Sequence, residues 1–218
     1  MGANRIMLEL DESHFEQVIL KALGDKFNKI LGNLSDFILD DARLIVRTAI
    51  TDSPEYSALL GQGGVDLQAH FGLISPVTVV NDIIYQLIDN MTVDVQKFKI
   101  SANGSSGGLS LKILRGDFSD VLAAKGTSYY SKHYLIDWLR WLLIEGTNDV
   151  VVGFDISFGD YKQSRSKKAI MIESHSSWHV PSAYSGTNQD NLLTRAINGI
   201  EGKIGIIIEN NLKKLLGI

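Results

Sequence analysis

The sequence predicts an α+β fold in which an antiparallel β-sheet is flanked by a long N-terminal helix and a long C-terminal helix. Apolar residues recur every three or four positions over residues 13–50 and again over residues 191–216, which is the pattern of an amphipathic helix. Between them, segments of alternating apolar and polar residues are separated by turn residues. No repeat, linker or low-complexity segment divides the 218 residues, so we expect a single domain over residues 1–218.

The N-terminal helix is expected over residues 13–50. At the usual rise per residue, a continuous helix of this length would measure roughly 55 Å. That exceeds the width of a compact domain of this size, and Gly32 and Asn33 both weaken a helix interior. We therefore expect the helix either to break near Gly32 or to protrude into a partner.

Two helix starts and one hairpin are predicted next. Ser53 and Ser75 each precede a proline, an arrangement that favours helix starts, and the second helix should run to about Asp89. Residues 91–101 and 108–114 alternate around a glycine-rich turn, so they predict an antiparallel hairpin. The alternation slips by one residue between Val95 and Phe98, which indicates a β-bulge. Residues 115–132 form a polar connection without an assigned element.

The C-terminal half is predicted to contain a helix over residues 133–145, a second hairpin and the last helix. The helix should end at Gly146. Residues 149–159 and 168–173 are rich in β-branched residues and are joined by the basic turn 160–167, so they predict two paired strands. The last helix should open near Asp190 and run to Leu216.

Composition narrows the classes of function. A formal net charge of −4 gives no reason to expect non-specific nucleic-acid binding. The chain has no cysteine, which excludes disulfides and thiolate metal sites and fits a reducing cytoplasm. The apolar runs are shorter than the roughly 20 residues that cross a bilayer, and the N-terminus lacks the apolar core of a signal peptide. We therefore expect no membrane contact.

Several short motifs follow one another in the order of these elements. They are a Ser-Pro-Glu-Tyr connection, the Trp141–Gly146 helix end, the Ser164-Arg-Ser-Lys turn, and the block Trp178-His-Val-Pro181, Ser185-Gly-Thr187 and Leu193-Thr-Arg-Ala-Ile197. The motifs and the order of elements resemble virion neck proteins of tailed bacteriophages. The resemblance covers residues 35–216 in the order of elements, and it is carried residue by residue only from Trp141 to Ile197.

The resemblance implies a structural virion protein without enzymatic activity or cofactor, assembled in the host cytoplasm. It would form a ring of sixfold or twelvefold symmetry that joins head and tail, as a head-closure, tail-completion or tail-terminator protein. Its partners would be further copies of itself, the neighbouring connector, neck or tail proteins, and DNA where the ring lines a channel.

The second hairpin and the loop after it form the predicted interaction surface. Arg165, Lys167 and Lys168 lie at a turn that a core does not need, and Trp178 and Tyr184 place large apolar area in a loop. Charges beside aromatic anchors are typical of protein interfaces.

The alternative function is that of a metal-dependent nuclease using Asp155 and Glu173. Two carboxylates on neighbouring strands can hold Mg²⁺, but the assisting lysine of such a site is replaced here by His175. His175 and His179 have the spacing of metal ligands on a helix, whereas Pro181 and the intervening serines favour a loop.

Overall fold

The computed structural model describes residues 12–101, 104–131 and 134–216. The α+β class is confirmed, with long helices at both ends, and the strands within these described ranges form three separate two-stranded antiparallel sheets. The helices and strands are, in order, α1 (Glu12–Thr51), α2 (Pro54–Leu59), α3 (Leu67–His70), α4 (Pro76–Asp89), β1 (Thr92–Ser101), β2 (Gly104–Lys112), α5 (Ser119–Leu122), β3 (Tyr129–Ser131), β4 (Tyr134–Ile136), α6 (Trp138–Arg140), the π-helix η1 (Trp141–Glu145), β5 (Val151–Phe158), β6 (Ala169–Trp178), α7 (Leu192–Asn198) and α8 (Glu201–Leu216).

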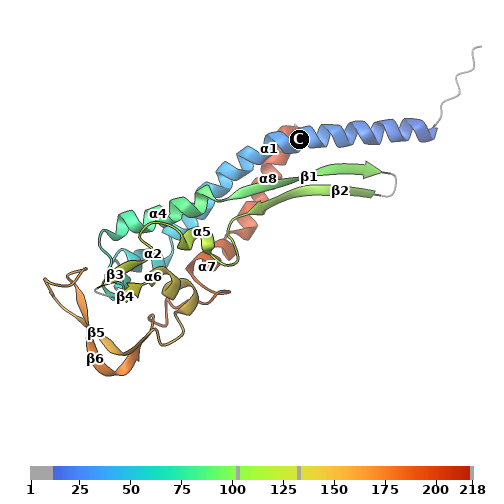
Figure 1. Cartoon of the computed structure of the whole chain (residues 1–218). Helices are drawn as coiled ribbons and strands as arrows, with labels where there is room; N and C mark the ends of the chain where they lie inside the picture. The colour runs from blue at the N-terminus through green and yellow to red at the C-terminus, as the bar shows by residue number, and fades with distance from the viewer. Residues whose placement is uncertain (1–11, 102–103, 132–133, 217–218) are drawn as a thin grey trace, which may run out of the picture.

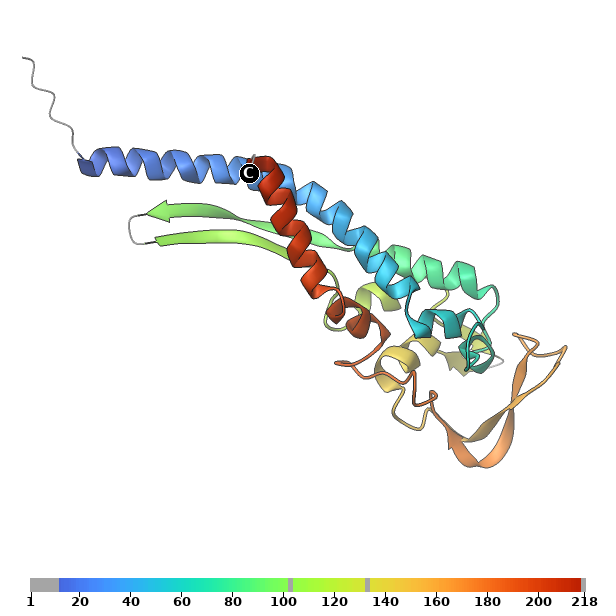
Figure 2. The same cartoon turned by 180° about the vertical axis from the view of Figure 1, so that it is seen from behind.

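The α1 helix runs through Gly32 without a break and bends along its course (Figures 1 and 2). Its C-terminal half buries Leu34, Ile38, Ala42 and Val46 in the body of the molecule. Its N-terminal half extends beyond the body beside the β1–β2 hairpin (Figure 1). We call α1 up to Leu31, together with β1 and β2, the arm.

The predicted bulge is confirmed, and it is the point at which the hairpin is fastened to α1. The register shifts between Gln96 and Lys99, which leaves the Phe98 peptide groups without a cross-strand partner at this point. Asn28 replaces that partner, because its Nδ2 donates to the Phe98 carbonyl at 3.1 Å and its Oδ1 accepts from the Phe98 N–H at 2.6 Å. The rings of Phe27 and Phe98 stack at 5.5 Å. One asparagine therefore satisfies both backbone groups of the bulge.

Other predicted elements are confirmed with changes at their ends. Ser53 caps α2 by accepting from the Tyr56 N–H, whereas Ser75 makes no side-chain cap, because its φ of 52° is left-handed. The helix predicted over residues 133–145 begins later. Tyr134 to Ile136 instead form β4 and pair with β3, and the helix consists of α6 and η1. Trp138 decides this start, because it is fully buried and its Nε1 donates to the Gly126 carbonyl at 2.7 Å.

The predicted last helix is two helices. Asn191 caps α7, and the helix is interrupted at Gly199 and Ile200 before α8 begins. The side chain of Ile200 is buried at this interruption, where the chain changes direction. The α8 helix then crosses the middle of α1 (Figure 2), where Asn211 donates to Asp41 at 3.0 Å.

The β5–β6 hairpin lies at the end of the molecule away from the start of α1 (Figure 1). The hairpin is confirmed, and β6 is longer than predicted because it continues through His175 to Trp178. The register is interrupted beside Gly153, whose φ of 79° suits only glycine, so the two strands bend there.

Candidate interaction surface

The turn of the β5–β6 hairpin folds back onto the body instead of projecting from it. The Arg165 guanidinium lies 3.6 Å from the centre of the Tyr129 ring, and its Nε donates to the Gly72 carbonyl at 3.3 Å. The Nζ of Lys168 donates to Asp66 at 2.9 Å and to Gln68 at 2.8 Å. We call these contacts the hairpin clamp.

The turn at which Arg165 and Lys168 lie is therefore held against the body of its own subunit, and their place in an interaction surface stays a prediction. Asp66 holds its place by capping α3, since its Oδ1 accepts from the Ala69 N–H at 2.9 Å. Its partner Lys168 is 102 residues away, so sequence spacing gave no signal for the pair. Lys167 is exposed and adopts a left-handed φ of 59° at the turn.

The prediction that Trp178 lies in an exposed loop is wrong. Trp178 ends β6 and is only 4% exposed. Its ring contacts Phe71 and Trp141, and its Nε1 donates to Nδ1 of His70 at 3.3 Å. Tyr184 is half-buried and packs against the same core. Trp178 therefore serves as an anchor inside the subunit.

Two titratable groups beside the clamp are shifted by burial. Burial lowers the pKa of His70 below 6.5, and the carboxylates of Asp66 and Asp155 oppose this only in part. A neutral His70 has the free Nδ1 lone pair that the Trp178 N–H requires. Burial likewise raises the pKa of Tyr129, against the opposing effect of Arg165. Both pKa shifts favour the neutral form, that of the His70 imidazole beside the clamp and that of the Tyr129 phenol within it.

The structure does not bring the proposed nuclease carboxylates together. Asp155 pairs with Ile172, and Glu173 pairs with Phe154. Since paired residues share a face and successive residues alternate, the two carboxylates point to opposite faces of the hairpin. His175 lies on β6 and His179 follows that strand, so neither is on a helix. Within the described ranges, no group of three or more histidine or acidic side chains is placed to hold a metal ion.

The motifs that carry the resemblance meet in the body as structural contacts. Glu55, from the Ser-Pro-Glu-Tyr connection, is 6% exposed and accepts from Nε and Nη2 of Arg195 at 3.1 and 2.8 Å. Arg195 also donates to Asp190 at 3.0 Å. The first and the last of the motif segments are therefore joined by an ion pair that spans 140 residues.

Asn191 joins the helix end at Gly146 to the segment before α7. It is fully buried, its Nδ2 donates to the carbonyls of Leu143 and Thr187, and its Oδ1 caps α7. Gly146 and Gly186 lie against each other, and a Cβ on Gly186 would meet Asn191 at 2.7 Å. These positions need an asparagine and two small residues for packing.

Sequence reasoning missed a second apolar face of α1. Phe15, Val18, Ile19 and Leu23 belong by spacing to the predicted core stripe, yet each is more than 40% exposed. Phe37 and Leu44 lie outside that stripe and are 61% and 64% exposed. The signal was present as apolar residues on more than one side of the helix.

The remaining features of the described part offer little chemistry. A small cavity between α1, α2, α4 and α7 is lined mainly by apolar side chains such as Ile50, Leu59 and Leu193. No helix in the described ranges combines the length and apolar character that membrane crossing requires. Scans against protein-family models, curated proteins and solved structures found no match.

Proposed function

We propose that this chain is a structural subunit of the neck of a tailed bacteriophage, where it assembles as a ring between head and tail. The proposal extends to a non-enzymatic role and to a location in the virion. Its partners are further copies of the chain and the adjoining connector, neck or tail proteins.

The observation that carries the proposal is that the motif residues make structural contacts. The buried Glu55 and Asn191 make contacts that join distant segments, Glu55 with the partly exposed Arg195. Gly146 and Gly186 permit close packing. Motifs of a catalytic family would place reactive side chains in a shared pocket. Motifs that fix a scaffold are what a structural protein requires.

The shape of the molecule supports the same conclusion. The N-terminal half of α1 and the β1–β2 hairpin extend beyond the body (Figure 1). Large apolar side chains remain exposed along α1, among them Phe15, Ile19, Phe37 and Leu44. Apolar surface of this kind is normally covered, which suits a subunit with neighbours.

The nuclease alternative has no comparable support. A two-carboxylate metal site needs both side chains on one side of the hairpin, whereas Asp155 and Glu173 lie on opposite faces. No observation favours this function over the structural one.

The experiment that tests the proposal is production of phage particles in the absence of this protein. We expect DNA-filled heads and complete tails that fail to join, and we expect the protein supplied in trans to restore joining. Antibody labelling of intact virions should mark the junction of head and tail. Joined, infectious particles that lack the protein would rule out the neck assignment.

A further inference from the structure

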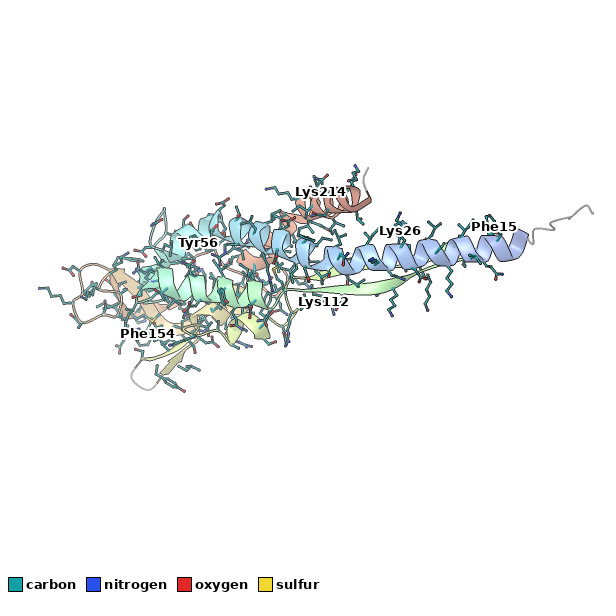
Figure 3. All side chains as sticks on the ribbon, turned by 90° about the horizontal axis from the view of Figure 1, so that it is seen from above. Phe15, Lys26, Tyr56, Lys112, Phe154 and Lys214 are labelled. Carbon is teal, nitrogen blue, oxygen red and sulfur yellow. The ribbon has the colours of Figure 1, made fainter. Side chains whose placement is uncertain are left out.

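The exposed side of α1 forms one continuous face along the helix. Residues spaced by three and four positions lie on one side of a helix, and this side is opposite to Gly24 and Asn28, which approach β1. The residues at these spacings are Phe15, Ile19, Ala22, Lys26, Ile30, Asn33, Phe37, Asp40 and Leu44. Figure 3 shows Phe15 and Lys26 on the N-terminal half of α1, away from the body.

The N-terminal half of this face is apolar and basic. Phe15, Val18, Ile19 and Leu23 are 42% to 55% exposed. Lys26 and Lys29 follow on the same side and are exposed. We call these six residues the arm face. Helix surface of this apolar character is normally covered.

The C-terminal half of the same helix carries the opposite charge. Asp36 and Asp40 are exposed there, beside Phe37 at 61% and Leu44 at 64% exposure. Asp40 lies 3.6 Å from Arg43 of the same helix, whereas the neighbouring Asp41 accepts from Asn211 of α8. We call Asp36, Phe37, Asp40 and Leu44 the ridge face. Arg47 follows it at the end of the helix. Each half of α1 therefore presents apolar side chains, and the charges of the two halves are complementary.

We propose that the arm face of one copy packs on the ridge face of α1 in a neighbouring copy. The inference rests on the proposed function only in taking the assembly to be a ring. The contact itself joins two different surfaces of identical chains. Such a head-to-tail contact generates a ring when its rotation closes. It also covers exposed apolar side chains on both copies, such as Phe15 and Ile19 on one and Phe37 and Leu44 on the other.

A second copy is the occupant that fits both faces at once. The arm face taken alone would suit any acidic partner, and the ridge face alone any basic one. Both faces occur on one helix, with two lysines in one and two aspartates in the other. A second copy therefore supplies the complement of each face without a further component.

Two single substitutions separate the faces. Ile19→Asp places a carboxylate on the arm face, where it would meet the aspartates of the ridge face. Leu44→Arg places a cation on the ridge face, where it would meet Lys26 and Lys29. Both side chains are substantially exposed in the subunit, so each variant should fold. Val152→Asp is the matched control, since Val152 is 73% exposed on β5 at the other end of the molecule.

Sedimentation velocity across a concentration series gives the result. We expect the wild type and Val152→Asp to self-associate, and each face variant to require at least about tenfold more protein, a change equivalent to 1.4 kcal/mol. A mixture of Ile19→Asp with Leu44→Arg should give a one-to-one heterodimer and nothing larger, because each pair retains one intact contact. Circular dichroism and thermal unfolding should show both variants folded.

Reversal of the charges gives a second test of the same contact. Lys26→Glu with Lys29→Glu should weaken association, as should Asp36→Lys with Asp40→Lys, and one chain carrying all four changes should associate again. The loss of association caused by each charge reversal should be smaller at high salt, because salt screens the attraction between exposed lysines and aspartates.

Three results would overturn the inference. The first is a wild type that stays monomeric, and the second is face variants that associate like the wild type. The third is a mixture of Ile19→Asp with Leu44→Arg that forms no heterodimer. Rings that form by another surface would leave the neck proposal intact.

Discussion

The ion pair between Arg195 and Glu55 shows how one residue holds distant motifs together. Glu55 is buried, and both of its contacts to Arg195 go to the same carboxylate oxygen. Removal of one partner leaves a buried charge without compensation, which is far more costly than the loss of an exposed pair.

We predict that Arg195→Met lowers the free energy of unfolding by about 3 kcal/mol, measured by urea denaturation. The control is Arg140→Met, which breaks an exposed pair with Glu145 at 2.8 Å and should cost less than about 1 kcal/mol. Equal losses in both variants would mean that Glu55 is hydrated in the folded protein.

Trp178 provides a second prediction at the scale of one residue. The sequence predicts that Trp178 lies in a loop, whereas the structure buries it. Its ring is buried between Phe71 and Trp141, so Trp178→Ala should destabilise the isolated subunit by about 3–5 kcal/mol. Thermal unfolding of the monomer measures this. Tyr130→Ala is the control, since Tyr130 is 73% exposed and its loss should change stability little. A stable Trp178→Ala subunit would return Trp178 to the list of interface candidates.

His70 should make stability depend on pH. Its pKa is lowered on folding from an ordinary value of 6.5, so below pH 6.5 the unfolded chain binds more protons at this site than the folded chain. The contribution of His70 is therefore complete well above pH 6.5 and is lost as the pH falls from there through the folded-state pKa. Protonation also removes the acceptor of the Trp178 N–H.

The measurement is urea unfolding of the wild type and His70→Gln over about pH 5 to 8. We expect His70→Gln to lose stability at neutral pH and to show a smaller decrease toward acid than the wild type. His175→Gln, at an exposed position on β6, should keep the wild-type pH profile. A wild-type profile in His70→Gln as well would assign the acid sensitivity to other groups.

Elements that depend on neighbouring residues were predictable, and those that depend on distant residues were not. The bulge between Val95 and Phe98 follows from a slipped alternation, and the cap of α2 follows from Ser53 before a proline. By contrast, the start of α6 depends on Trp138 reaching the Gly126 carbonyl, and the hairpin clamp depends on Asp66. Periodicity describes one face of one element and does not identify its partner in space.

The same reasoning explains the mixed outcome at the predicted interaction surface. Basic residues at a turn and a tryptophan near a proline are typical of an exposed loop, yet Tyr129 and His70 lie where they contact Arg165 and Trp178. For the carboxylates Asp155 and Glu173, only the strand register reveals that they face apart.

The hydrogen bonds between Asn28 and Phe98, which hold the β1–β2 hairpin against α1, can be tested at the scale of this element. Asn28→Ala leaves the N–H and C=O of Phe98 without their partner, so the hairpin should open more often around the bulge. Hydrogen exchange at Phe98 should accelerate by roughly tenfold, as expected for a loss of about 1.4 kcal/mol. Asn33→Ala, at an exposed position of α1, should leave exchange at Phe98 unchanged.

At the scale of the whole molecule, the chain divides into a body that buries its core and an arm that leaves much of its surface uncovered. The largest fully buried side chains, among them Trp138, Phe71 and Leu142, lie in the body. The arm is joined to it by the continuous helix α1 (Figure 3). Substitutions of buried side chains in the body should therefore act on folding, whereas substitutions on the arm face and the ridge face should act on association.

The crossing of α1 by α8 also determines when the protein can fold during its synthesis. Leu34, Ile38 and Ala42 leave the ribosome early, but the crossing helix is encoded by residues 201–216, at the other end of the chain. At translation rates of about 5–20 residues per second, the early segment waits on the order of ten seconds or more for that partner. During this interval an apolar helix is exposed on a nascent chain, close to identical chains on the same messenger RNA. The packing of α1 against α8 is therefore completed only after residues 201–216 have been synthesised.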